Sequence, residues 1–254
     1  MSSSSVTAVL TGASSRIGKV IAEDLAAHGW RLVLHAHKGS DRVERLAHQI
    51  KADGGDCLIQ IADLTDFDAL TSFMDVTTAK FGPADVLINN ASIFEDDSLG
   101  SLNPTLFDQH FAIHTRAPVF LSEGLARHLP TDRRGLVVNL IDQRVWKPTP
   151  QALSYSLSKA ALWDATQRMA QALAPAVRVN AIGPGPSFKN ERQSDVEFDK
   201  QSRSVLLQSG PSPSEFGQTI RYFWASTSVT GQMIALDGGQ HLAWRTPDVT
   251  DVGE

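Results

Sequence analysis

The sequence is short of the features that mark several classes of protein. It has one cysteine, Cys57, among 254 residues, so an intrachain disulfide and a zinc site built on cysteines are excluded. No stretch approaches the roughly 20 apolar residues that a membrane-spanning helix needs. Residues 1–5 lack the basic patch and apolar core of a secretory signal. We therefore expect a cytoplasmic protein that does not enter a membrane.

The chain also has only a small excess of one sign of charge over the other. The 23 Lys and Arg residues against 28 Asp and Glu residues give a net charge of −5, which offers no basic surface for nucleic acid or an anionic membrane. Hydrophobic residues make up 42% and charged residues 20%, as in an ordinary globular protein. No linker or repeat divides the chain. We expect one domain over residues 1–254, with a polar tail from about residue 245.

Short runs of β-branched and aliphatic residues alternate with longer segments of helical spacing. Helical spacing recurs at Ile17, Ile21 and Leu25, and Asn103-Pro104 predicts the start of a long helix that continues past Leu121. This alternation predicts an α/β fold, a doubly wound parallel sheet of about seven strands with helices on both faces. The strands are expected at 6–10, 31–34, 57–61, 85–88, 136–141, 177–181 and 232–236.

A glycine-containing turn follows the first predicted strand directly. Residues 11–18 read TGASSRIG, and an apolar helix comes next. Gly12 and Gly18 allow a tight turn and a close approach of the backbone, and the helix start offers unpaired N–H groups. At the first strand-to-helix junction of a parallel sheet, this pattern predicts a pyrophosphate site, although a plain tight turn would leave the same pattern.

The end of the second predicted strand indicates which dinucleotide would bind. Enzymes that use NAD usually carry an acidic residue there to bind the ribose hydroxyls, and this chain has Lys38 instead, with Arg16 in the nearby turn. Cations suit a 2′-phosphate, so NADP(H) is favoured. His35 and His37 share one strand face and could be a metal pair, but without a third ligand in view we expect no metal site.

Tyr155 and Lys159 lie four residues apart, on one face of a predicted helix. A lysine ammonium beside a phenol lowers the pKa of the phenol, so the tyrosine could donate a proton while a neighbouring nicotinamide delivers hydride. The Tyr-x-x-x-Lys pattern alone is common and mostly structural. Further along, a loop at 183–187 and a polar segment at 189–203 predict a mobile flap beside the site, with Glu191, Arg192 and Phe198 as candidates for the pocket wall.

Taken together, these motifs resemble the short-chain dehydrogenase/reductase family. The resemblance rests on residues 11–18, 89–91, 184–185 and 237–239 and on the Tyr155–Lys159 pair, and it spans the chain to about residue 244. It implies a Rossmann fold, hydride transfer by a nicotinamide cofactor and, commonly, a homotetramer. It also implies that Tyr155 is the proton donor and that Lys159 holds the nicotinamide ribose and acidifies Tyr155.

The resemblance places further residues around the cofactor. Asp63 and Leu64 would border the adenine, and Asn89 would steady the cofactor at the fourth strand. The full set expected to contact NADP(H) is Gly12, Ser14, Ser15, Arg16, Ile17, Gly18, His37, Lys38, Ser40, Asp63, Leu64, Asn89, Ala91, Tyr155, Lys159, Pro184, Gly185 and Ser187.

Two positions depart from the family pattern and indicate a subgroup. Asp142 stands where most members have a serine, and His114 stands where many have a catalytic asparagine. With Arg16, Ser92 and Phe94, this constellation resembles the pteridine reductases and the bacterial dihydromonapterin and dihydrofolate reductases. In that subgroup the arginine and serine face cofactor phosphate and pterin, the phenylalanine stacks on the pterin, and the aspartate and tyrosine deliver the proton.

The chemistry of the residues agrees with a ring substrate. Phe94 can cover a flat heteroaromatic ring, and reduction of a ring C=N bond needs a proton on nitrogen, which a carboxyl group such as Asp142 can relay. The substrate site would thus comprise Arg16, Ser92, Phe94, Asp142 and Tyr155, with Asp142, Tyr155 and Lys159 catalytic and a pterin-like small molecule as the partner.

Other interpretations stay open at this point. Asp142 could cap a helix or pair with Arg144 as a loop carboxylate, Phe94 could be core packing, and His114 could replace the usual relay or merely pack in its helix. The protein could instead be a carbonyl reductase of a ketone, sugar or acyl thioester. It could also be an NADPH-binding sensor without turnover, which the retained Tyr155–Lys159 pair argues against.

Overall fold

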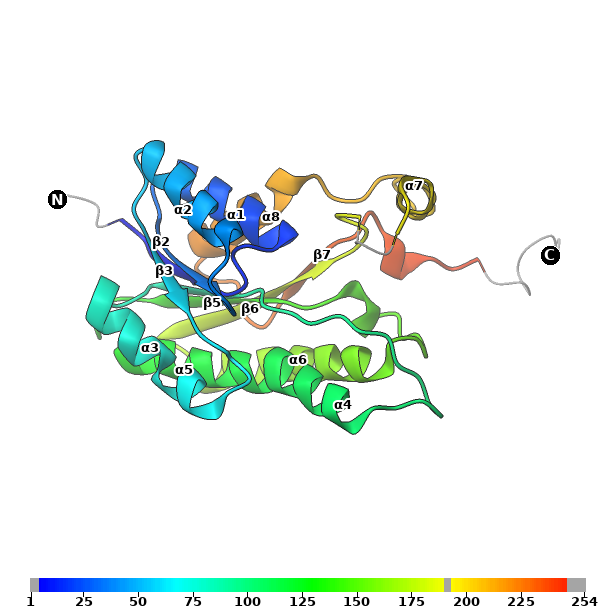
Figure 1. The fold of residues 1–254 in the computed structure, drawn as a ribbon, viewed down its shortest axis with the longest axis horizontal. Helices are drawn as coiled ribbons and strands as arrows, with labels where there is room; N and C mark the ends of the chain where they lie inside the picture. Colours follow the sequence, from blue (N-terminus) through cyan, green and yellow to red (C-terminus); the bar gives the residue numbers. More distant parts are fainter. Residues whose placement is uncertain (1–4, 190–192, 246–254) are drawn as a thin grey trace.

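The computed structural model describes residues 5–189 and 193–245, and these residues form three layers (Figure 1). A central sheet has helices α1, α2 and α8 on one face and α3, α4, α5 and α6 on the other. The strands are β1 (Thr7–Leu10), β2 (Arg31–Ala36), β3 (Cys57–Ile61), β4 (Val86–Asn89), β5 (Gly135–Leu140), β6 (Val177–Pro184) and β7 (Met233–Leu236). The α-helices are α1 (Arg16–Ala27), α2 (Asp41–Ala52), α3 (Phe67–Phe81), α4 (Pro104–Phe111), α5 (Ala117–His128), α6 (Leu153–Ala172), α7 (Asp195–Arg203) and α8 (Pro213–Ala225).

The sheet has seven strands in the order β3-β2-β1-β4-β5-β6-β7, and every pairing is parallel. The predicted doubly wound α/β sheet of the Rossmann type is confirmed, and each predicted strand coincides with an observed one. The strand order reverses between β1 and β4. In open α/β sheets, ligands bind beyond the carboxyl ends of the strands at such a reversal.

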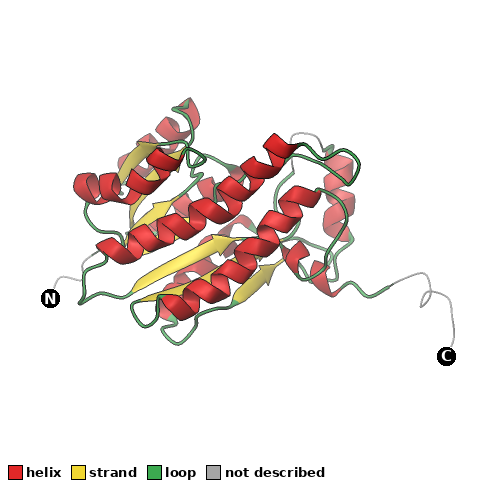
Figure 2. Cartoon of the chain, turned by 90° about the horizontal axis from the view of Figure 1, so that it is seen from below, coloured by secondary structure: helices red, strands yellow, loops and turns green. Residues whose placement is uncertain are grey.

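The strands are apolar along their whole length because both of their faces are buried. In β1, Ala8 and Leu10 pack toward α1, α2 and α8, whereas Val9 packs toward α3, α5 and α6. All three side chains are 0% exposed. The view in Figure 2, turned by 90° from that of Figure 1, shows the helices crossing the sheet. Burial on both faces leaves only the strand ends free to carry polar chemistry.

The long helix predicted from Asn103 is divided in the structure. Asn103 caps its start as predicted, since its side chain accepts a hydrogen bond from the Leu106 N–H. After α4 comes a π-helical segment, η1 (Ala112–Arg116), and only then α5. Pro118 has no N–H, so an α-helical bond to the His114 carbonyl cannot form, which favours a wider turn here. His114 lies in this widened turn and is 1% exposed.

The predicted flap contains regular structure beside the sheet. Its residues 195–203 form α7, which lies beyond the carboxyl end of β7 in Figure 1. Glu191 and Arg192 lie outside the described residues, as does nearly all of the predicted polar tail, at 246–254. Within the described part of the chain, no helix combines the length and the apolar character needed to cross a bilayer.

A buried chain of side-chain hydrogen bonds fixes α6 against the sheet. At the end of β4, Asn89 donates from Nδ2 to Asn139 Oδ1 over 2.8 Å, and Asn139 Nδ2 donates to Thr166 Oγ1 over 2.8 Å. Thr166 then donates to the carbonyl oxygen of Leu162. Asn139 and Thr166 are 0% exposed. Because α6 carries Tyr155 and Lys159, this ladder sets where their side chains meet the sheet.

We predict that Asn139→Ala lowers the free energy of unfolding by about 1–3 kcal/mol, because the buried Asn89 amide loses its acceptor. Urea unfolding followed by circular dichroism measures the change. The control is Gln49→Ala on the exposed side of α2, which is expected to cost less than about 0.5 kcal/mol. Equal losses in the two variants would contradict the ladder.

Candidate active site

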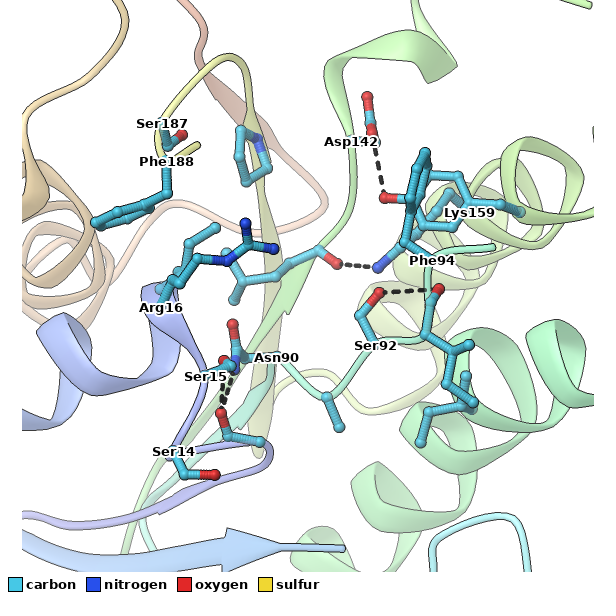
Figure 3. A pocket seen from close by; sticks show the side chains of 18 of the residues that line it. Ser14, Ser15, Arg16, Asn90, Ser92, Phe94, Asp142, Lys159, Ser187 and Phe188 are labelled. Carbon is cyan, nitrogen blue, oxygen red and sulfur yellow. Dashed lines mark hydrogen bonds between the residues drawn. The ribbon is translucent and has the colours of Figure 1, made fainter. Parts of the chain in front are cut away.

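A cavity of about 960 Å³ opens at the carboxyl ends of the central strands, where the strand order reverses. Its walls come from the β1–α1 turn, the ends of β2, β4 and β5, the start of α6 and the loop after β6. Figure 3 shows Ser14, Ser15, Arg16, Asn90, Ser187 and Phe188 on one side of the cavity and Ser92, Phe94, Asp142 and Lys159 on the other. The volume is near the upper end of the range of about 300–1,000 Å³ for ligand pockets.

The glycine turn is built to bring backbone close to a ligand. Gly12 has φ +64°, and a Cβ atom there would lie 2.9 Å from Ala91 Cα, so only glycine fits. Behind it, Asn90 Nδ2 donates to the carbonyl oxygens of Thr11 and Gly12 over 2.9 and 3.0 Å. Ser15 caps α1 by accepting from the Gly18 N–H. The first N–H groups of α1 therefore face the cavity in a fixed position.

His35 is part of this turn rather than half of a metal pair. Its Nδ1 atom accepts from the Gly12 N–H over 3.2 Å, so its Nε2 atom carries the proton and donates to the Ala62 carbonyl over 3.0 Å. Burial lowers the pKa of His35 to about 4. His37 lies apart from it and pairs with Asp63, with 3.5 Å between Nδ1 and Oδ1. The described residues contain no cluster of three or more His, Cys, Asp or Glu side chains that could hold a metal ion.

A second hollow, lined by cationic side chains, adjoins the cavity beyond β2. Lys38, Ser40 and Arg45 line it, and Arg42 lines both this hollow and the main cavity. Lys38 and Ser40 were predicted from the sequence, but Arg42 was not. The sequence feature that indicates Arg42 is its place as a basic residue in the first turn of the helix that follows the second strand. The hollow also contains Ser14 and Asp41, and its three cations with two serine hydroxyls suit a ribose phosphate.

These donors fit the predicted NADP(H). The start of α1 offers N–H groups to a pyrophosphate, and Lys38 and Arg42 offer charge to an additional phosphate. Asp63 and Leu64, which were predicted to border the adenine, also line the cavity. Gly185 also fits a tightly packed wall, because a Cβ atom there would lie 2.6 Å from Asp237 Cα.

The loop after β6 closes one side of the cavity. Pro184, Gly185, Ser187 and Phe188 line it, and Ser187 Oγ donates to the Gly185 carbonyl over 3.0 Å. Arg16 crosses from α1 to this loop, where its Nη1 atom donates to the carbonyl of Lys189 over 2.7 Å. The predicted wall residue Phe198 does not line the cavity. Besides His35 and Arg42, the lining residues that were not predicted from the sequence are Ala36, Thr65, Asn90, Ile93, Gln109, Ile113, Leu140, Ile141, Pro186, Phe188, Gln193 and Gln201.

Asp142 and Tyr155 both line the cavity and form its reactive corner, and Figure 3 shows Asp142 there on the same side as Phe94 and Lys159. Asp142 follows β5, and its Oδ1 atom accepts from the backbone N–H of Arg144 over 2.8 Å, which caps the short helix η2 (Gln143–Val145). Its Oδ2 atom accepts from the Tyr155 hydroxyl over 3.2 Å. The helix-capping role, which was one interpretation of Asp142 from the sequence, is therefore confirmed. This bond also orients the second carboxylate oxygen toward the Tyr155 hydroxyl.

The expected acidification of Tyr155 by Lys159 is wrong. The pKa of the Tyr155 phenol lies well above 10, because burial and the adjacent Asp142 carboxylate both disfavour the phenolate. Lys159 Nζ donates to the Leu140 carbonyl over 2.8 Å, and burial lowers its pKa to about 8. Tyr155 thus keeps its proton at neutral pH and donates it in a hydrogen bond to Asp142.

Phe94 is a cavity wall and not core packing. Its side chain is 47% exposed and lines the cavity, although core packing was one interpretation of the sequence. Its ring meets the Tyr155 ring edge-to-face, with 4.8 Å between centroids, and the Arg144 guanidinium lies 5.9 Å from its centroid. An exposed ring beside a proton donor provides a surface on which a flat substrate can stack.

Two predicted cofactor contacts are corrected. Asn89 is buried and belongs to the ladder with Asn139, and the next residue, Asn90, lines the cavity instead. Gly18 lies behind the turn, where a Cβ atom would come within 2.2 Å of the Gly12 carbonyl oxygen, so it serves packing. Every other residue predicted to bind cofactor or substrate or to be catalytic lies on the cavity wall or, for Lys38 and Ser40, in the adjoining hollow.

Comparison with known proteins gives related enzymes over nearly the whole chain. The family model described as short chain dehydrogenase matches residues 6–197. The crystal structure of FolM alternative dihydrofolate reductase 1 from Brucella canis, complexed with NADP, is 49% identical with a TM-score of 0.93, and the match covers 96% of this chain and 97% of that one. Dihydromonapterin reductase from Klebsiella pneumoniae is 28% identical over 240 residues, 92% of this chain and 96% of that protein. A 3-oxoacyl-(acyl-carrier-protein) reductase from Synechocystis is 29% identical over 238 residues, 91% of this chain and 95% of that protein.

The pKa of Lys159 predicts a pH dependence of stability. Its pKa is about 8 in the folded protein against 10.5 for an ordinary lysine, so the unfolded chain binds more protons between these values. Stability rises with pH wherever the unfolded state binds more protons. Wild type should therefore gain about 2 kcal/mol relative to Lys159→Met between about pH 7.5 and about pH 9.5.

Urea unfolding of both proteins at several pH values measures this difference. Lys80→Met is the matched control, because Lys80 faces solvent on α3, and its difference from wild type should vary by less than about 0.5 kcal/mol. A difference for Lys159→Met that stays flat over the same pH range would refute the lowered pKa.

Proposed function

The chain belongs to the short chain dehydrogenase family, and we propose that within it the protein reduces a ring C=N bond of a pterin with NADPH. The substrates are dihydromonapterin, dihydrobiopterin or dihydrofolate. The observation that carries the proposal is the hydrogen bond between Tyr155 and Asp142 at the corner of the cavity, beside the exposed ring of Phe94. The FolM structure at 49% identity supports the same substrate class.

NADP(H) is the cofactor that the residues and the relatives support. The FolM structure from Brucella canis is complexed with NADP. In this chain the start of α1 and Arg16 would hold the pyrophosphate, Lys38 and Arg42 the 2′-phosphate, and Lys159 the nicotinamide ribose. When bound, NADPH supplies a hydride to the carbon of the C=N bond and becomes NADP⁺.

The chain's own residues supply the proton that balances this reaction. The C=N double bond becomes a C–H bond and an N–H bond, so one proton must reach the ring nitrogen. Tyr155 holds a proton at neutral pH and lies 3.2 Å from Asp142 Oδ2. Asp142, partly exposed to the cavity, takes up a proton from solvent and replaces the one that Tyr155 gives to the substrate. The pair works as one proton relay.

Other residues orient the ring for that transfer. Phe94 would stack on one face of the pterin, and aromatic pairs of this kind contribute about 0.5–1.5 kcal/mol beyond burial. Ser92 faces the cavity from the loop after β4 and would bond a polar edge of the ring. Lys159 donates to the Leu140 carbonyl, which ties α6 to the end of β5 directly beside the reactive corner.

A carbonyl reductase is the second candidate, and the relation to 3-oxoacyl reductases favours it. Tyr155 and Lys159 would act in the same way on a ketone or acyl thioester, and Asp142 would be incidental. Asp142→Ser separates the two. A ketone reductase should tolerate or gain from the change, whereas a pterin reductase should lose most of its turnover, because a serine hydroxyl is a much poorer acid.

We predict that the purified protein oxidises NADPH in the presence of 7,8-dihydromonapterin and 7,8-dihydrobiopterin. Tyr155→Phe and Asp142→Asn should each lower kcat by about 100-fold or more, because general acid catalysis contributes about 10²–10⁴-fold. Loss of NADPH absorbance measures turnover, with NADPH affinity as the check that each variant is intact. NADPH binding without oxidation across pterins and carbonyls would instead support a sensor.

A second prediction concerns the cofactor. Arg42→Ala should raise KM for NADPH about tenfold and leave KM for NADH within about twofold, because a hydrogen bond to a charged group contributes about 1.5–3 kcal/mol and solvent reduces this at an exposed site. Arg168→Ala, an exposed arginine on α6 paired with Asp164, is the control. Equal effects of Arg42→Ala on both coenzymes would contradict a role at the 2′-phosphate.

Two expectations from the sequence remain proposals beside this function. The homotetramer is tested by sedimentation equilibrium of the purified chain, where a monomer would refute it. Residence in the cytoplasm is tested by fractionation of cells that produce the protein.

A further inference from the structure

His114 is buried beneath the catalytic tyrosine and has hydrogen bonds on both ring nitrogens. Its ring meets the Tyr155 ring edge-to-face at 5.2 Å and stacks on His110 at 5.5 Å. Its Nδ1 atom lies 2.8 Å from Ser158 Oγ, and its Nε2 atom lies 2.9 Å from Ser92 Oγ. His114 itself does not line the cavity, so any effect on substrate must act through a neighbour.

The geometry determines which nitrogen carries the proton. The backbone N–H of Ile93 points at His114 Nε2 over 3.2 Å, so this nitrogen must be an acceptor. Nδ1 is then the protonated nitrogen and donates to Ser158, whose own hydroxyl donates to the Tyr155 carbonyl over 2.7 Å. Burial, with Lys159 and His110 nearby, holds the pKa of His114 well below 6.5, which agrees with a neutral ring.

This arrangement also fixes the hydroxyl of Ser92. Two acceptors lie near its oxygen: His114 Nε2 at 2.9 Å and the Ile93 carbonyl at 3.5 Å. The second distance is beyond the usual range of about 2.5–3.0 Å for an O–H donor, so the Ser92 hydroxyl donates to His114 Nε2, whose single lone pair it shares with the Ile93 N–H. The lone pairs of Ser92 Oγ then remain for a ligand in the cavity, which Ser92 lines.

We propose that His114 is a positioning residue that makes Ser92 an acceptor, so that the site selects a substrate ring with an N–H donor. This inference rests on the proposed function, because a pterin carries such amino and ring N–H groups. The reacting end of a ketone or an acyl thioester carries none. His114 therefore contributes to specificity through Ser92 and touches neither substrate nor cofactor.

Two amide substitutions separate the two bonds of His114. In His114→Gln the amide reaches the place of Nε2 and can still accept from Ser92, whereas in His114→Asn it reaches only the place of Nδ1, toward Ser158. With 7,8-dihydrobiopterin as the probe, His114→Asn should raise KM for the pterin about tenfold with kcat within about threefold. His114→Gln should stay within about threefold of wild type in both constants. KM for NADPH should not change in either variant.

The same pair in a Ser92→Ala background completes the test. In that background, His114→Asn and His114→Gln should have equal KM values for the pterin, because the hydroxyl through which His114 acts is gone. Equal KM values of the Asn and Gln variants in the Ser92 protein, or a gap between them that persists in Ser92→Ala, would overturn the proposal. A His114→Asn enzyme whose activity with the pterin equals or exceeds that of wild type would also overturn the proposal.

A measurement on the wild-type protein without substrate separates this inference from the proposed function. ¹⁵N NMR of the imidazole nitrogens, assigned among the eight histidines by comparison with His114→Gln, should show a protonated Nδ1 and an unprotonated Nε2 for His114. A protonated Nε2 or a doubly protonated ring would refute the positioning role. Failure to oxidise NADPH with any pterin would refute the proposed function alone.

Discussion

The carboxylate of Asp142 accepts two hydrogen bonds, and the site depends on both. One comes from the Arg144 backbone and fixes the carboxylate at the end of β5, and the other comes from the Tyr155 hydroxyl on α6. Burial and this carboxylate keep the phenol protonated. A serine at this position would carry no charge, so only burial would still raise the pKa of the phenol. The aspartate thus changes what the tyrosine can do.

The rest of the fold holds the partners of that bond in place. Asn139, at the end of β5, bridges β4 and α6, so the strand that leads to Asp142 and the helix that carries Tyr155 share one buried ladder. His114 ties α6 to the loop that presents Ser92. At the other end of the cavity, Asn90 and His35 hold the glycine turn. Polar side chains at strand ends do this work because the strands themselves are apolar on both faces.

The sequence predicts most of the fold, and for a physical reason. Strands buried on both faces leave continuous apolar runs, and the residues after them, such as Gly12 and Asp142, are found by position alone. The finer choices depend on three-dimensional packing. Neighbouring residues at a strand end point in opposite directions, so Asn89 and Asn90 could not be told apart without the exact end of β4. The pKa of Tyr155 depends on burial and on a distance to Asp142 that no spacing reveals.

The bond that receives the hydride distinguishes a pterin reductase from a carbonyl reductase most directly. NADPH carrying deuterium on its transferable position would be mixed with the enzyme and 7,8-dihydromonapterin, and the product examined by NMR. The account predicts one deuterium on the ring carbon of the former C=N bond and a solvent-derived proton on the adjacent nitrogen. An unlabelled ring, with the label appearing only when a ketone or acyl thioester is supplied, would contradict it.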